Sequence, residues 1–192
     1  MNTAKTLELL QSEAAYARMC ELYGAEKAEE NIRRYGELVK KFRENFGEND
    51  ILMFSSPGRT EISGNHTDHN HGKVLAGSIN LDCVGIAARN EPSRVNIISE
   101  TFQQKFTIDL NDLQPSDKKA GTVDLVKGLL KGFQESGYEV GGFDAYITSN
   151  VISSAGVSSS ASFEMLLCSM LNRFFNDGRM DTVAYAHIGK YA

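Results

Sequence analysis

Residues 57–72, PGRTEISGNHTDHNHG, gather side chains that could do chemistry. The stretch holds Arg59 directly after a Pro-Gly pair and three of the chain's four histidines, with Asp68 between two of them. Imidazole and carboxylate groups can ligate a metal ion, and with an amide they can also bind the hydroxyls of a sugar. A solvated polar loop would explain the same composition. The residue types alone leave these three interpretations open.

The spacing makes a dedicated metal site the least favoured interpretation. Four possible ligands, His66, Asp68, His69 and His71, lie within six residues. Their spacing matches no standard zinc pattern, and no cysteine lies nearby. We therefore interpret His69 and His71 as solvated loop residues.

A second stretch, NVISSAGVSSSASFEM at residues 150–165, could bind a phosphate. A predicted strand ends there, a loop of small residues follows, and a helix begins at the serines. Such a loop collects backbone N–H groups at the positive end of a helix dipole, and its hydroxyls can add donors or a magnesium ligand. No Gly-Lys-Ser/Thr follows, so it is not a Walker A loop. Taken alone, a serine-capped helix is the simpler interpretation.

Together, the two stretches resemble the galactokinases, a branch of the GHMP small-molecule kinases that also contains homoserine, mevalonate and phosphomevalonate kinases. The residues that match the first family motif are Gly58, Arg59, Gly64, His66, Thr67, Asp68, Asn70 and Gly72. Those that match the second are Gly156, Ser158, Ser159, Ser160, Ala161 and Ser162. The resemblance runs from about residue 50 to residue 192.

The resemblance implies a role for each matched position. It makes Arg59 a catalytic residue beside the attacking oxygen and the γ-phosphate, where a fixed positive charge stabilises phosphoryl transfer. The implied sugar-binding residues are Asn65, His66, Thr67 and Asp68. The implied ATP-binding residues are Ser99, Ser154, Ala155, Gly156, Val157, Ser158, Ser159 and Ser160, and Ser160 is also the implied magnesium ligand.

The expected function is ATP-dependent phosphorylation of the C1 hydroxyl of galactose, with ATP and Mg²⁺ as cofactors. Several positions depart from the family pattern, and among them Asn65 replaces a glutamate, Ile152 a proline and Ser154 a glycine. An N-acetylgalactosamine kinase or another sugar kinase is therefore an alternative. A catalytically silent sensor of sugar and ATP on the same fold is a second alternative.

The elements that must position these residues are read from periodicity and turn signals. Helices are predicted at residues 3–20, 25–46, 122–137, 158–175 and 180–192, and strands at 51–56, 73–79, 82–88, 94–99, 105–110 and 143–151. This order predicts an α+β fold with a mixed or mostly antiparallel sheet and packed helices. The resemblance implies the N-terminal domain of GHMP kinases, a fold also called ribosomal protein S5 domain 2-like.

Two regions are expected along the chain: an N-terminal helical segment at residues 1–48, and the GHMP kinase N-terminal domain at 49–192. The resemblance also implies a catalytic aspartate in a G-L-M-D-Q-like motif and a C-terminal domain. Neither the motif nor the domain is found in these 192 residues. We therefore expect an N-terminal fragment, inactive alone, on which the missing domain would pack.

Composition excludes several other classes. The net charge of −5 gives no support to nucleic-acid binding, and no apolar run is long enough to span a membrane. The N-terminus lacks the basic and apolar regions of a signal peptide. Three widely spaced cysteines form no disulfide framework, which favours a reducing, cytoplasmic location.

Overall fold

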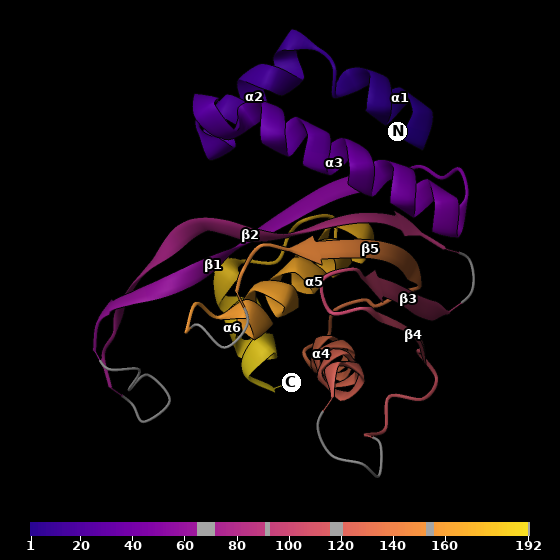
Figure 1. The fold of residues 1–192 in the computed structure, drawn as a ribbon. Coiled ribbons are helices and arrows are strands. Elements are labelled where there is room, and N and C mark those ends of the chain that lie inside the picture. The colour runs from indigo at the N-terminus through magenta and orange to yellow at the C-terminus, as the bar shows by residue number, and fades with distance from the viewer. Residues whose placement is uncertain (65–71, 91–92, 116–120, 153–155, 192) are drawn as a thin grey trace. The chain divides into compact units, whose positions relative to one another are not determined.

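A computed structural model describes residues 1–64, 72–90, 93–115, 121–152 and 156–191 (Figure 1). The helices are α1 (Thr3–Leu9), α2 (Glu13–Tyr23), α3 (Ala25–Phe46), α4 (Thr122–Glu135), α5 (Ser159–Phe175) and α6 (Thr182–Tyr191). The strands are β1 (Leu52–Ser63), β2 (Leu75–Arg89), β3 (Arg94–Ser99), β4 (Gln104–Asp109) and β5 (Phe143–Ser149). They form one five-stranded sheet in the order β1-β2-β5-β3-β4. The predicted α+β class is confirmed.

The first of two compact units contains Met1–Met53, Gly85–Thr107 and Gly142–Thr148. In it, α1 and α2 pack on α3 (Figure 1). The buried residues of α3 recur mostly at a spacing of three or four residues, which is the periodicity of an amphipathic helix. Strands β3 and β5 pair in parallel, with Val95 opposite Phe143 and Ser99 opposite Ile147.

The predicted helix at residues 3–20 is wrong, because two helices occupy this range. Ser12 has an extended backbone, and its hydroxyl accepts a hydrogen bond from the N–H of Ala15 at 3.2 Å. This is the geometry of an N-cap, so a second helix begins at Glu13. The alanine- and leucine-rich composition concealed the cap because both halves have helical periodicity.

The second unit contains Phe54–Val84, Ile108–Gly141 and Ser149–Ala192. Helices α4, α5 and α6 pack against one another in it. Their buried apolar side chains include Leu129, Phe133, Leu166, Leu167, Met170 and Ile188. All helices in the described part of the chain are too short or too polar to cross a bilayer.

Two strands are longer than predicted. The predicted strand at residues 51–56 does not end at Pro57-Gly58, because β1 continues to Ser63. β1 lies at the edge of the sheet, where a proline without an N–H is tolerated. The predicted strands at 73–79 and 82–88 form the single strand β2. Asp82 does not interrupt β2, since its buried carboxylate accepts a 2.6 Å hydrogen bond from the hydroxyl of Ser55.

Candidate active site

Arg59 lies on strand β1 and contacts the residues that precede helix α5. Its side-chain Nε donates a 3.1 Å hydrogen bond to the hydroxyl of Ser158. Its backbone N–H donates to the carbonyl of Val157, also at 3.1 Å. The two stretches singled out in the sequence, 99 residues apart at this contact, therefore meet in the second unit.

Gly58 allows this close approach. A Cβ atom at this position would lie 2.9 Å from the carbonyl oxygen of Val157, 3.0 Å from Val151 and 3.1 Å from Ile79. Real Cβ atoms essentially never come within 3.0 Å of another residue's heavy atoms, and a backbone carbonyl cannot move as easily as a side chain. The glycine is therefore needed because β1 packs directly against the backbone of the loop before α5.

The first turn of α5 is built from serines with different partners. Ser158 precedes the helix with a left-handed backbone (φ 61°, ψ 48°) and makes no side-chain cap hydrogen bond. Ser160 is exposed, and its hydroxyl donates to Oε1 of Glu164 at 2.9 Å. Ser162 is buried, and its hydroxyl donates to the carbonyl of Ser56 at 2.7 Å. The predicted serine-capped start is therefore wrong in detail, since the hydroxyl of Ser158 accepts from Arg59 instead.

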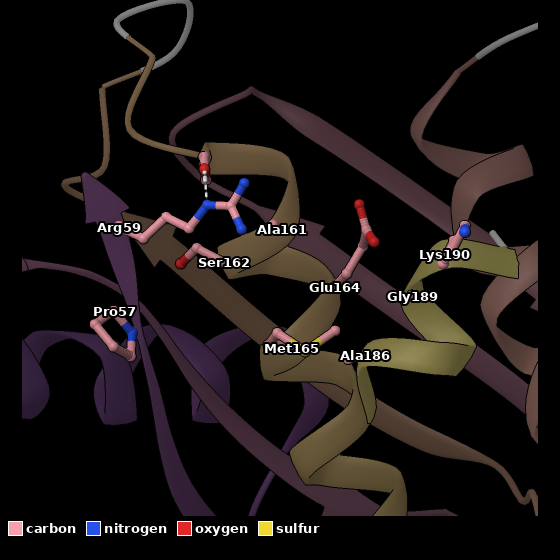
Figure 2. A pocket seen from close by; sticks show the side chains of 10 residues that line it. Pro57, Arg59, Ala161, Ser162, Glu164, Met165, Ala186, Gly189 and Lys190 are labelled. Atoms are coloured by element: carbon pink, nitrogen blue, oxygen red, sulfur yellow. Dashed lines mark hydrogen bonds between the residues drawn. The ribbon is translucent and has the colours of Figure 1, made fainter. Parts of the chain in front are cut away.

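A pocket of about 480 Å³ opens beside this turn. Its lining residues are Pro57, Arg59, Ser158, Ala161, Ser162, Glu164, Met165, Ala186, Gly189 and Lys190. Arg59, Glu164 and Lys190 bring charged groups to it, while Met165 and Ala186 supply an apolar side (Figure 2). Its volume lies in the range of about 300–1,000 Å³ that is usual for small-molecule sites. An apolar surface with a few convergent charges is usual for a small-molecule site.

The protein environment changes the acidity of two groups on α5. Burial raises the pKa of Glu164, and the hydrogen bond from Ser160 opposes this shift. Burial also raises the pKa of the Cys168 thiol to about 12, with a smaller contribution from the charge of Glu164. The thiol of Cys168 is therefore protonated and unreactive at neutral pH.

Several predicted site residues lie outside the described part of the chain. These are the four sugar-binding candidates Asn65, His66, Thr67 and Asp68, the two loop residues Ser154 and Ala155, and the alternative metal ligands His69 and His71. Among the residues that the structure does describe, no three His, Cys, Asp or Glu side chains cluster closely enough to hold a metal ion. The metal interpretation of the histidine stretch therefore stays untested.

The structure brings some predicted residues together and places Ser99 in a different unit. Arg59, Val157 and Ser158 are in contact through the two hydrogen bonds above, and Ser159 and Ser160 begin the adjoining helix. Gly156 precedes them with φ 72°, and within the described part of the chain a Cβ there would meet no atom of a non-adjacent residue within 4 Å. Ser99 is buried at the end of β3 in the first unit, so its nucleotide-binding role stays a prediction.

Glu164 and Lys190 were missed by sequence reasoning. Glu164 follows Ser160 by one helical turn, so the i, i+4 rule could have identified it as a neighbour of the serine turn. Lys190 reaches the pocket from α6, which contacts α5. No local sequence signal could have placed it there, because that contact depends on tertiary packing.

Comparisons with known proteins cover both stretches that meet at this site. The galactokinase galactose-binding signature matches residues 40–89, which include Arg59, and the GHMP kinases N terminal domain matches residues 124–192, which include the serine turn. The chain belongs to the galactokinase branch of the GHMP kinases. Both matched segments line the pocket. Pro57 and Arg59 come from the first segment, and the other lining residues come from the second.

Curated galactokinases are similar over most of this chain. A galactokinase from Clostridium tetani is 36% identical over 162 residues, which are 84% of this chain and 41% of the relative. A galactokinase from Lactococcus lactis is 36% identical over 151 residues, which are 77% of this chain and 38% of the relative. This chain thus spans about two fifths of the length of these relatives.

Solved structures share the fold. A crystal structure of Lactococcus lactis galactokinase complexed with galactose superposes with a TM-score of 0.72 at 32% identity, over 81% of this chain and 40% of the other. Mevalonate kinase from Methanococcus jannaschii superposes with a TM-score of 0.61 at 15% identity, over 73% of this chain and 45% of the other. The second match shows only that the fold is shared.

Proposed function

We propose that the protein containing this chain is a galactokinase, which transfers the γ-phosphoryl group of ATP to the C1 hydroxyl of galactose. The observation that carries the proposal is the contact between Arg59 and Ser158, which holds a guanidinium at the start of α5 on the edge of a pocket. The galactokinase signature over residues 40–89 supports galactose as the sugar. The chain spans about two fifths of the length of its galactokinase relatives, so the activity is proposed for a protein of their full length.

The start of α5 is suited to the phosphates of ATP. Backbone N–H groups and the positive end of the helix dipole converge there, and the side chain of Ser158 makes no cap hydrogen bond to the turn. Gly156 carries no side chain, and no non-adjacent residue that the structure describes would contact a Cβ there, so an anion could approach this part of the backbone closely. Arg59 adds a fixed positive charge at the same end of the helix, where it would stabilise the negative charge of the transferred group.

Mg²⁺ fits the same turn with help from the nucleotide. Ser160 donates its hydroxyl hydrogen to Glu164, which leaves the oxygen lone pairs directed away from that carboxylate. Mg²⁺ in kinases takes one or two protein ligands and completes its shell with substrate phosphates and water. Ser160 would be one such ligand, and the bound ion would neutralise charge on the phosphates.

The sugar would lie on the 65–68 segment. Asp68 would accept hydrogen bonds from sugar hydroxyls, and Asn65 and His66 would pair with others. A site whose polar groups are satisfied only by the correct hydroxyl pattern rejects analogues that lack it. Asn65 is the position at which a different sugar, such as N-acetylgalactosamine, would be accommodated.

Activity of the full-length protein tests the proposal. We expect galactose to be phosphorylated with the highest kcat/KM in a panel with glucose, N-acetylgalactosamine and mannose. Arg59→Ala should lower kcat by roughly 100- to 1,000-fold because it removes a preorganised charge from the transition state. Arg179→Ala is the matched control, since that side chain is 80% exposed and pairs with Asp177.

Three outcomes would separate the alternatives. No phosphorylation of any hexose, with galactose and ATP still bound, would favour the silent sensor. A preference for another sugar would favour the related kinases. An active Arg59→Ala protein would refute the catalytic role of the arginine. The C-terminal domain and the cytoplasmic location remain proposals that rest on the family.

A further inference from the structure

Two hydrogen bonds join strand β1 to the start of α5, and the residues involved, with the glycine that allows the close approach, are Gly58, Arg59, Val157 and Ser158. The backbone N–H of Arg59 bonds to the carbonyl of Val157, and its Nε bonds to the hydroxyl of Ser158, both at 3.1 Å. Gly58 lets the strand reach the same carbonyl without a clash. We call these four residues the latch.

Ser158 adopts an unusual conformation for its position. A serine at a helix N-cap normally has an extended backbone, and its hydroxyl accepts from an N–H of the first turn. Ser158 instead has a left-handed backbone, which is unfavourable for residues other than glycine, and makes no cap hydrogen bond. Unfavourable backbone conformations that persist tend to occur at functional sites, where the surrounding structure holds them in place.

The left-handed backbone coincides with the contact to Arg59. The Ser158 hydroxyl, not used for capping, accepts from Nε of Arg59. A hydrogen bond at Nε restrains both the plane and the direction of a guanidinium, because this atom lies between the stem and the two terminal nitrogens. Figure 2 shows the guanidinium beside the first turn of α5, with its terminal nitrogens on the pocket side.

We propose that Ser158 is a positioning residue for Arg59, one that orients the guanidinium toward the transferred phosphoryl group. The inference rests on the proposed function and deepens it, since the resemblance assigns Ser158 only to ATP binding. Its consequence is that the phosphate loop and the catalytic arginine behave as one unit. A nucleotide that contacts Val157 or Ser158 would therefore also act on the direction of the arginine.

Two substitutions at Ser158 separate the hydroxyl from the backbone. Ser158→Gly removes the hydroxyl and suits the left-handed conformation, whereas Ser158→Ala removes the hydroxyl and keeps the unfavourable backbone. In the full-length protein, we expect both to lower kcat for galactose about 10- to 100-fold, because small misplacements of a catalytic group have effects of this size. The KM for ATP should change less than about 3-fold, since no phosphate contact of the backbone is lost.

A double-mutant cycle with Arg59→Ala tests whether Ser158 acts through the arginine. If it does, Ser158→Gly causes no further loss of kcat once Arg59 is removed. A loss that multiplies with that of Arg59→Ala would overturn the inference, because Ser158 would then act on the phosphates directly. A raised KM for ATP with an unchanged kcat in Ser158→Gly would overturn it as well.

The control for backbone relief is Gln103→Gly. Gln103 is an exposed residue with φ 49° that is not among the pocket-lining residues, so its replacement relieves the same kind of conformation at a different site. We expect unchanged kcat and KM for this variant. A loss of kcat equal to that of Ser158→Gly would show that the effect is unspecific and would count against the latch.

A measurement on Arg59 itself separates this inference from the proposed function. In ¹⁵N NMR spectra of the wild-type protein, the Nε–H signal of Arg59 should exchange slowly with water, and Ser158→Gly should restore fast exchange. If no sugar is phosphorylated but this signal behaves as expected, the proposed function fails and the latch stands. If the protein is active and the signal is equally fast in both proteins, only the latch fails.

Discussion

The hydroxyl of Ser162 on α5 donates a 2.7 Å hydrogen bond to the backbone carbonyl of Ser56 on β1. Both residues are buried, with exposures of 2% and 7%, and they lie 106 positions apart in the chain. This bond joins the same two elements as the contact between Arg59 and Ser158, one helical turn further along α5. The strand that carries the arginine is thus fixed to the start of the helix by two contacts, and each of them involves residues that line the pocket.

Ser162→Ala should destabilise the second unit. It removes the partner of a buried carbonyl, which costs about 1–3 kcal/mol of the free energy of unfolding. Urea unfolding of wild type and variant measures the difference. Ser169→Ala on the same helix is the control, because its hydroxyl bonds to Leu166 within α5 and its loss leaves β1 untouched. Equal effects of the two substitutions would contradict a specific contribution from the bond to Ser56.

Gly58→Ala should lower the stability of the protein more than a glycine-to-alanine substitution in a strand usually does. The new methyl group would meet the carbonyl of Val157 at 2.9 Å, and a clash of this kind costs about 1–3 kcal/mol. Gly77→Ala in β2 is the matched control, since its Cβ would lie at an ordinary 3.6 Å from Ile62. Chemical denaturation should show a loss at position 58 and no loss at position 77. A stable Gly58→Ala protein would mean that the loop can move away from the strand.

Much of the fold could be predicted because periodicity and turn residues reflect burial directly. The helix at 122–137 and the strand at 94–99 are close to α4 and β3 as observed. The end of β1 could not be predicted, because Pro57-Gly58 is a turn signal in most contexts. Here the edge position accommodates the proline, and the packing of Val157 requires the glycine.

In the candidate site, too, local motifs could be recognised from the sequence, whereas contacts that depend on tertiary packing could not. Arg59 and the serine turn were found because each lies in a local motif, and their contact confirms that the two motifs meet. The bond partner of Ser158 could not be predicted, since a serine before a helix normally caps it. Lys190 was missed because only the packing of α6 on α5 brings it to the pocket.

Asn172→Ala should loosen α6 and therefore the side of the pocket that α6 lines. The buried Asn172 amide donates to the hydroxyl of Tyr185 at 2.7 Å, and its oxygen accepts from the N–H of Met180 at 3.2 Å. Loss of these buried bonds should cost about 1–3 kcal/mol. Hydrogen exchange should show faster exchange across α6, with α4 changed much less. Asn45→Ala is the control, because Asn45 is exposed and bonds within its own helix.

Glu164→Gln should change how stability depends on pH. Burial raises the pKa of Glu164 above its ordinary value of 4.5, so the folded protein holds this proton more tightly than the unfolded chain does. The resulting contribution to stability is fully present below the unfolded pKa and is lost as pH rises through the folded pKa. The glutamine variant cannot ionise, so its stability relative to wild type should increase as pH rises from the unfolded pKa of Glu164 through its raised folded pKa.

Ser160→Ala provides the second arm of this experiment. The hydrogen bond from Ser160 lowers the pKa of Glu164, so its removal should raise that pKa further and shift the loss of stability to higher pH. Urea unfolding across the same pH range measures all three proteins. A constant difference between wild type and Glu164→Gln at every pH would show that the carboxyl of Glu164 titrates equally in the folded and unfolded chains. The charge that Glu164 brings to the pocket would then be as easily formed as in water, and burial would not be limiting its ionisation.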